Sequence, residues 1–244
     1  MADIVNMQNV SFSAQDRKII DDLSFSFEEG KITALVGPSG CGKSTILKLA
    51  AGLIVPQKGE VLYNGTVIAT MSRKENLNFR FNSAFVFQDS ALWANQSLFQ
   101  ILELPLLIHY PKMKKPEREK RIEEVIGIVG YKKDLNIRPA QLSMGEQKLL
   151  AFARAIMCSP SLLFLDEWVE SLDENSAARL IKLVKKHKSE GGSVIFVCHD
   201  MRIINDISDI VVMVLGGQIY MNMTKEQIQN DERLREYIET GIQS

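Results

Sequence analysis

The chain reads Gly37-Pro38-Ser39-Gly40-Cys41-Gly42-Lys43-Ser44-Thr45 at residues 37–45, which matches the pattern GxxxxGK[ST] at every required position. An apolar, β-branched run precedes it and good helix formers follow it, so the sequence predicts a strand, this loop and a helix in that order. The glycines let backbone N–H groups turn toward a phosphate, and the helix start adds unpaired N–H groups and partial positive charge. We expect Lys43 to reach the β- and γ-phosphates of a nucleotide and the Ser44 hydroxyl to bind Mg²⁺. The stretch therefore predicts a phosphate-binding loop, with a glycine-rich turn that binds nothing as the alternative.

The composition is that of an ordinary globular protein. The 244 residues are 45% hydrophobic and 24% charged, and 29 basic residues against 30 acidic ones leave a formal net charge of −1. The hydrophobic and charged fractions argue against disordered and fibrous classes of protein. The balance of basic and acidic residues gives no support for nucleic acid as a partner. We find no secretory signal and no apolar run near the ~20 residues that span a bilayer, so the chain is not expected to cross a membrane by itself. The three cysteines lack metal-ligand spacing, which suits a reducing cytoplasm.

The hydrophobic pattern predicts an α/β fold. Strand-like runs occupy residues 4–12, 23–27, 32–36, 60–63, 83–87, 162–165, 194–198 and 210–215. Helical patterns occupy residues 43–53, 116–129, 146–158, 174–189 and 201–207, and the tail 224–244 also looks helical. Strands alternate with helices in the second half, which predicts a mostly parallel sheet. The early runs, with Gly30 and Asn64-Gly65 as turns, look antiparallel.

The whole chain, 1–244, is expected to form one domain with three parts. Residues 1–88 and 144–244 form a P-loop NTPase core with an N-terminal antiparallel β subdomain, and residues 89–143 form an inserted helical subdomain. A run rich in lysine and arginine at 112–121 falls in this insert. It reads as a solvated loop and exposed first helical turns, with a basic docking patch as the alternative.

Two carboxylates end the apolar run Leu162-Leu163-Phe164-Leu165, far downstream of the loop. A buried parallel strand would bring Asp166 to the end of the sheet beside the phosphate loop, where it can hold Mg²⁺ through water. Glu167, one step beyond, would be placed to orient or deprotonate a water that attacks the γ-phosphate. Together the two motifs predict a nucleotide-hydrolysing site.

The run Leu142-Ser143-Met144-Gly145-Glu146-Gln147 precedes a helical pattern, so Ser143 and Gly145 lie where an N-cap and exposed N–H groups are expected. Here the chain resembles the ATP-binding cassette (ABC) ATPases, whose signature is LSGGQ. In that family this helix start completes the γ-phosphate site of the opposite subunit. The resemblance therefore implies that Ser143, Met144, Gly145 and Glu146 act in trans.

Other family landmarks follow in order, from Val10 to about Ile228. Gln88 matches the glutamine of the family's Q-loop, which binds Mg²⁺ and joins the core to the helical subdomain. Asp173 matches the D-loop, which passes between subunits. His199 matches the switch histidine that contacts the γ-phosphate, so the resemblance implies a catalytic pair of Glu167 and His199.

Three residues depart from the family pattern at the signature and the catalytic strand. Met144 replaces the first signature glycine, and its side chain could crowd the phosphate approach. Glu146 replaces the signature glutamine and places a carboxylate near the γ-phosphate region, although it also suits the helix dipole. Trp168 stands where the family usually has proline. These changes lower the expected turnover more than the expected ATP binding.

Two further positions leave alternatives open. The family's adenine-stacking aromatic is missing near Ala14, and Phe12, two residues earlier on the same strand face, is the candidate, with core packing as the alternative. Cys41 lies inside the phosphate loop, where N–H dipoles could lower its thiol pKa; a small filler residue is the alternative.

The resemblance also implies cofactors and partners. ATP and Mg²⁺ are the expected cofactors, and one loop with one signature implies a second copy of the chain or a homologous cassette. The segment 91–99 resembles the place where family members receive a helix from the membrane subunit. We therefore expect the ATPase of a transporter whose transmembrane permease is a separate chain, bound peripherally at the cytoplasmic face of the inner membrane.

A finer resemblance concerns the cargo. The segments 69–72, 87–93 and 103–106 look like those of Mla-type ATPases, which work with MCE-domain proteins in lipid transport across bacterial envelopes. Amino-acid importers and lipoprotein-release ATPases share part of this similarity and remain alternatives. A soluble ABC ATPase and a weakly hydrolysing, nucleotide-dependent regulator are the alternatives from other classes.

Overall fold

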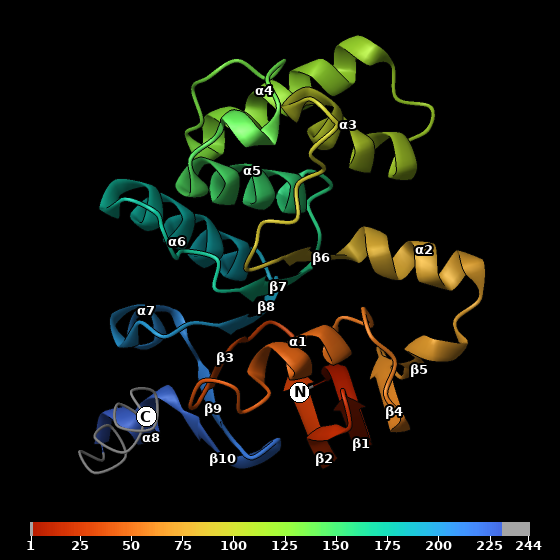
Figure 1. Cartoon of the computed structure of the whole chain (residues 1–244), viewed down its shortest axis with the longest axis vertical. Coiled ribbons are helices and arrows are strands. Elements are labelled where there is room, and N and C mark those ends of the chain that lie inside the picture. Colours follow the sequence, from red (N-terminus) through yellow and green to blue (C-terminus); the bar gives the residue numbers. More distant parts are fainter. Residues whose placement is uncertain (1, 231–244) are drawn as a thin grey trace.

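The computed structural model describes residues 2–230, which form two β-sheets and a group of helices (Figure 1). The larger sheet has the strand order β10-β9-β3-β8-β7-β6. Its parallel strands are β3 (Ile32–Val36), β6 (Ser83–Val86), β7 (Leu162–Asp166), β8 (Ser193–Val197) and β9 (Ile210–Leu215), and β10 (Gln218–Thr224) runs antiparallel to β9. The smaller sheet is antiparallel, in the order β2-β1-β4-β5, with β1 (Asp3–Ala14), β2 (Arg17–Glu28), β4 (Lys58–Tyr63) and β5 (Thr66–Val67). The predicted fold class is confirmed.

Helices lie against both faces of the larger sheet. On the side of the smaller sheet, α1 (Lys43–Ala50) packs against β7 and β8 as well as β1 and β2. On the other side lie α5 (Met144–Ile156) and α6 (Glu174–Ser189), and α5 carries α3 (Leu98–His109) and α4 (Lys115–Val129). The remaining helical segments are α2 (Arg73–Asn82), α7 (Met201–Ile207), α8 (Lys225–Asn230) and the short turns η1 (Ile68–Thr70) and η2 (Pro139–Gln141). Within residues 2–230, no helix has the length and apolar character needed to cross a membrane.

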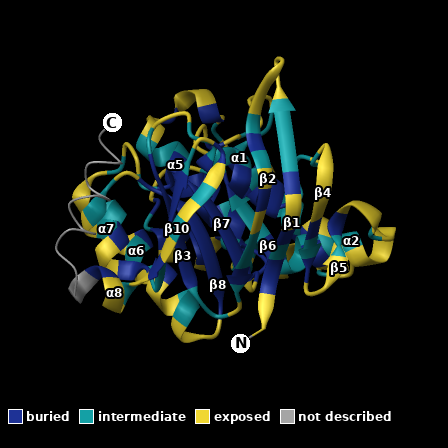
Figure 2. Cartoon of the chain, turned by 90° about the horizontal axis from the view of Figure 1, so that it is seen from below, coloured by how far each residue is buried: buried dark blue, intermediate teal, exposed yellow. Residues whose placement is uncertain are grey.

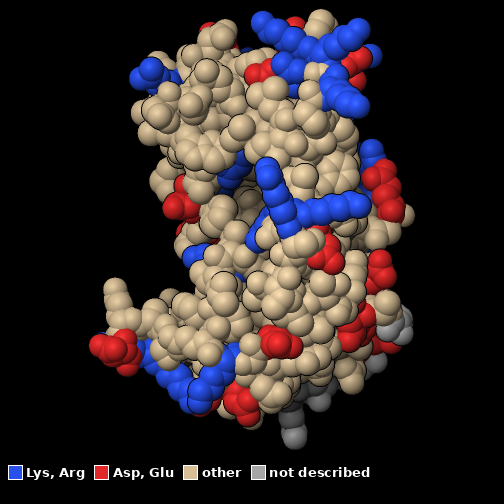
Figure 3. Space-filling view, turned by 90° about the vertical axis from the view of Figure 1, so that its right-hand side faces the viewer, with Lys and Arg blue, Asp and Glu red and all other residues tan. Residues whose placement is uncertain are grey.

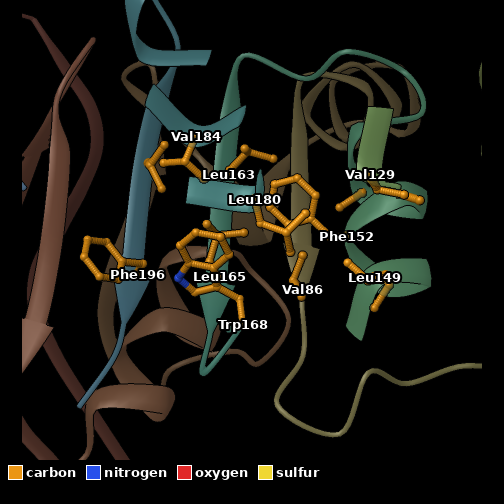
Figure 4. Close-up of a cluster of buried hydrophobic side chains, with 14 of the residues drawn as sticks. Val86, Val129, Leu149, Phe152, Leu163, Leu165, Trp168, Leu180, Val184 and Phe196 are labelled. Atoms are coloured by element: carbon orange, nitrogen blue, oxygen red, sulfur yellow. The ribbon is translucent and has the colours of Figure 1, made fainter. Parts of the chain in front are cut away.

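The larger sheet separates two hydrophobic cores. All five residues of β7 are buried, and successive side chains point to opposite faces. Leu163 and Leu165 join the core beneath the helices, which Figure 4 shows with Phe152 and Trp168, whereas Leu162 and Phe164 join the core around α1. Figure 2 shows that the buried residues lie at the centre of the molecule, where the strands of the larger sheet run, and that the exposed residues lie around them. Burial on both faces explains why the parallel strands read as continuous apolar runs rather than as alternating ones.

Serine caps define where several helices begin. The Oγ atoms of Ser72, Ser97 and Ser143 each accept a hydrogen bond from the backbone N–H three residues later. The side-chain oxygen of the Glu or Gln at that position in turn accepts a hydrogen bond from the serine N–H. These capping boxes satisfy backbone donors that a helix start leaves unpaired.

The structure corrects several sequence-based boundaries. The predicted helix at 43–53 ends at Ala50, and the one at 146–158 begins at Met144 and ends at Ile156. Asn64-Gly65 forms the β4–β5 turn as predicted, but Gly30 leads from β2 into the other sheet. The hairpin between β1 and β2 turns instead at Gln15 and Asp16, which adopt positive φ without glycine. The predicted helical tail contains α8, and residues 231–244 lie outside the described part.

Candidate functional site

The loop at 37–45 joins β3 to α1, in the strand–loop–helix context expected from the sequence. Three of its glycines have positive φ: Gly37 (143°), Gly40 (77°) and Gly42 (107°). A Cβ on Gly37 would lie 2.2 Å from the carbonyl oxygen of Val214, whereas a Cβ on Gly40 would meet nothing within 4 Å. The loop therefore packs tightly at its start, and its exposed tip at Ser39 and Gly40 leaves open space for a ligand.

Lys43, the first residue of α1, is buried and folds back over the loop. Its Nζ donates hydrogen bonds to the carbonyl oxygens of Gly37 and Pro38, both at 2.8 Å. Gly42 is the N-cap of α1, and no side chain in the described part of the chain caps that helix start. The loop thus presents an ammonium group and helix N–H groups at one place, which is the arrangement that binds phosphate.

Asp166, at the carboxyl end of β7, lies beside the start of α1. The Ser44 hydroxyl donates a hydrogen bond of 2.8 Å to Asp166 Oδ1. Burial raises the pKa of the Asp166 carboxyl, and the bond from Ser44 opposes that shift. A hydroxyl and a carboxylate are hard oxygen ligands, so these two residues fit a Mg²⁺ ion chemically.

Glu167 and His199 come from neighbouring strand ends and meet at 2.8 Å between Oε1 and Nε2. Burial, with a smaller effect of the Asp166 carboxylate, raises the pKa of Glu167 to about 7. Burial, with the nearby charge of Lys43, lowers the pKa of His199. Both shifts disfavour the charged forms, so a hydrogen bond between the carboxyl and the imidazole describes the contact better than a fixed ion pair does. A carboxyl with a pKa near neutrality can accept a proton from water.

Gln88 lies two residues beyond β6, which is the neighbour of β7 in the sheet. Its backbone carbonyl accepts a hydrogen bond from the buried Nζ of Lys148 on α5. The structure thus places Gln88 at the same sheet edge as Asp166 and Glu167.

The signature residues form the start of α5. Ser143 is its N-cap, and Met144 is exposed at 69% of its surface. Glu146 accepts a hydrogen bond from the Ser143 N–H at 3.0 Å and forms an ion pair with Lys133 Nζ at 2.6 Å. The contact with Lys133 and the bonds from Ser143 lower the pKa of Glu146. The Glu146 carboxylate therefore caps the start of α5 and pairs with Lys133. Gly145 packs closely against the chain before α6, since a Cβ on it would lie 2.7 Å from the Ser171 carbonyl oxygen.

The remaining candidates occupy separate places. Asp173 is the N-cap of α6 and accepts a hydrogen bond from the Ser176 N–H at 3.0 Å. Phe12 is half-buried on β1, packs on the core around α1 and pairs in register with Ile20. The suggestion of a lowered thiol pKa at Cys41 is wrong: burial raises it, outweighing the effect of Lys43.

Sequence reasoning missed two cations on α5. Lys148 and Arg154 were read only as part of a helical pattern, yet both bind the loops beside the site. One sequence signal could have revealed Lys148: it is a charged residue on the apolar face of its helix, and charged residues are rarely buried there without a partner.

The sequence was compared with known proteins. Residues 20–170 match the family model of ABC transporters. The phospholipid transport ATP-binding protein MlaF of Escherichia coli K12 is 31% identical over 242 residues, covering 98% of this chain and 90% of that protein. The nickel import protein NikE of Shigella flexneri is 35% identical, with 84% and 78% covered. The methionine import protein MetN of Cutibacterium acnes is 32% identical and covers 86% of this chain, which spans 58% of MetN.

Solved structures share the fold. A dimeric post-hydrolysis state of the ATP-binding cassette MJ0796, bound to ADP and Pi, superposes with a TM-score of 0.83 at 26% identity, covering 91% of this chain and 98% of that one. An ATP-binding subunit of an ABC transporter superposes with a TM-score of 0.84 at 21% identity, covering 99% and 100%.

Substituting Gly37→Ala should weaken nucleotide binding. The added Cβ would approach the Val214 carbonyl oxygen to 2.2 Å, which displaces the loop. We expect affinity for a fluorescent ATP analogue to fall by about tenfold or more, a loss of at least about 1.4 kcal/mol. Gly30→Ala is the control, since Gly30 also has positive φ but open space around it. Equal affinities in the two variants would contradict the assigned role of the loop.

Proposed function

The chain belongs to the ABC transporter family of ATPases, and we propose that it powers phospholipid transport across a bacterial envelope as the ATP-binding subunit of a membrane complex. The observation that carries the cargo assignment is the similarity to MlaF, which extends over 98% of this chain and 90% of that protein. The metal and amino-acid import relatives match less of this chain. Methionine or nickel import, lipoprotein release and a soluble ABC role are the competing functions.

The chain binds and hydrolyses ATP, and we assign the steps to residues as follows. Lys43 and the N–H groups of the loop hold the phosphates. The Glu167 carboxylate, whose pKa burial raises to about 7, takes the proton from the attacking water. His199 orients that carboxyl through their hydrogen bond. Ser44 and Asp166, with Gln88, would hold Mg²⁺, which neutralises phosphate charge when bound.

The site is completed by a second cassette in this proposal. Met144 and Ser143 stand at an exposed helix start, which suits a role in trans toward the phosphate loop of a partner copy. Asp173 lies at the start of α6, near the same surface. The dimeric state of MJ0796 supports a dimer of this chain.

Glu167→Gln should abolish most turnover while leaving ATP binding intact, because the amide cannot accept the proton. We expect steady-state phosphate release to fall by about 10²–10⁴-fold, the usual contribution of a general base. Glu123→Gln, an exposed carboxylate on α4, is the control. Equal rates in wild type and Glu167→Gln would favour the weakly hydrolysing regulator.

An apolar groove of about 470 Å³ is the proposed docking site of the permease. It lies between α3 and the β6 end of the sheet, and its lining includes Phe81, Phe85, Phe87, Trp93, Leu104 and Ile108. Trp93 and Ile108 both line this groove and are exposed at 47% and 50%, so the groove gathers exposed apolar surface of the kind that marks interaction sites. Figure 3 shows that the face that carries α2 is hollowed at mid-height, with basic side chains around the hollow and a second basic group at the top of the molecule. We propose that residues 89–143 form the helical subdomain whose α3 borders this groove.

Ile108→Asp should detach the membrane subunit without affecting ATP binding, because a charge in the groove must be desolvated on docking. Co-purification from detergent extracts should fall below detection. The matched control is Ile128→Asp, on α4 outside the groove and exposed at 42%. Equal recovery of the membrane subunit with both variants would exclude this groove as the docking site.

The cargo is tested by reconstituting the complex in vesicles with fluorescent phospholipid. We expect lipid movement that requires ATP and is lost with Glu167→Gln. A complex that hydrolyses ATP and moves methionine or nickel but no phospholipid would refute lipid transport. An MCE-domain protein and a permease that co-purify with the chain would support it.

A further inference from the structure

The backbone near the site leaves the sheet at two neighbouring points. The β6–β7 ladder ends with the pair Val86↔Leu165. Gln88 and Glu167 lie two residues beyond these positions, in two separate loops. Their separation is therefore set by contacts other than the β-ladder.

Lys148 connects these two loops. It lies on α5 and is 3% exposed, and its Nζ donates hydrogen bonds to the carbonyl oxygens of Gln88 and of Glu167, the latter at 2.8 Å. Burial lowers the pKa of Lys148, and the charges of the Glu170, Asp166, Glu167 and Asp89 carboxylates oppose that shift. One buried cation thus holds both loops from the signature helix and offsets their negative charge.

The backbone of Glu167 needs such support. Its φ is 46°, a left-handed backbone conformation that residues other than glycine rarely adopt. Non-glycine residues keep it only where surrounding contacts fix them. Here the Glu167 N–H donates to the Val197 carbonyl oxygen at 3.1 Å, and its carbonyl accepts from Lys148. The Glu167 carbonyl also accepts a hydrogen bond from the Glu170 N–H at 3.4 Å. Both peptide groups of Glu167 are therefore held, and its carboxyl lies 2.8 Å from His199 Nε2.

We propose that Lys148 is a positioning residue for hydrolysis: it fixes the Glu167 backbone and the Gln88 loop to α5, so that the catalytic carboxyl stays aligned. The inference rests on the proposed role of Glu167. Lys148 lies little more than one helical turn beyond Ser143. Lys148 thus connects the helix that begins at the signature to the loop that carries Glu167.

Lys148→Met removes the donors and keeps the length of the side chain. We expect kcat for ATP hydrolysis to fall by about 10- to 100-fold, the usual effect of misplacing a catalytic group by about 1 Å, with KM for ATP changed less than about twofold. Lys186→Met is the control, because that lysine is on α6 with its side chain 67% exposed. Thermal unfolding of each variant verifies folding. If Lys148→Met does not fold, Lys148→Gln, which keeps one donor group, is measured in its place with the same expected split of kcat and KM.

The decisive measurement is the double variant with Glu167→Gln, assayed by radiolabelled phosphate release. If Lys148 acts through Glu167, its loss adds no further decrease in that background. A kcat equal to that of Lys186→Met, or losses that multiply in the double variant, would overturn the inference. An unaffected Glu167→Gln single variant would instead refute the proposed function. A loss in Glu167→Gln with none in Lys148→Met refutes only the role of Lys148.

Discussion

Parallel strands that are neighbours in a sheet end at the same edge, and the candidate site depends on that constraint. The order β3-β8-β7-β6 brings the phosphate loop, His199, the Asp166–Glu167 pair and Gln88 to one edge. The Ser44–Asp166 hydrogen bond spans this edge although β8 lies between their strands. Ligands of open α/β sheets bind in this crevice outside the carboxyl ends. Apolar residues pack against both faces of the sheet. Polar groups from different strands can therefore meet at the edge where the strands end.

Side chains of α5 add to the backbone hydrogen bonds that hold the loops at this edge. Ser90, Ala91 and Glu167 all have positive φ without being glycine. Arg154 donates to the carbonyl oxygens of Ser90 at 3.1 Å and Ala91 at 2.7 Å, and its guanidinium lies over the Trp93 ring at 5.5 Å. Since α5 supplies this contact as well as that of Lys148, the same helix contacts the proposed docking groove and the candidate site of hydrolysis. A strained loop held by one rigid helix is suited to changing state when that helix moves.

The sequence predicted those parts of the site that are contiguous motifs, because their chemistry and their local structure have the same cause. An apolar run that ends in Asp166 predicts both a buried strand and an acidic strand end beside the phosphate loop, and the structure has both. α2 was missed because its residues are largely polar and Phe79 is its one fully buried side chain. The contacts of Lys148 and the turning of Glu146 toward Lys133 join residues far apart in the chain or fixed by packing, so no local pattern encodes them. The turn at Gln15 and Asp16 lacks the glycine that usually marks such a hairpin.

Because side chains alternate along β7, this one strand separates the two cores and also sets the direction in which the Asp166 carboxylate points. Inserting a single residue between Leu165 and Asp166 would either exchange Leu163 and Phe164 between the two cores or turn the carboxylate away from Ser44. Packing and chemistry are therefore inseparable at this strand under insertion or deletion. Evolution can lengthen the surface loops of such a protein freely, but it can change this strand only by substitution.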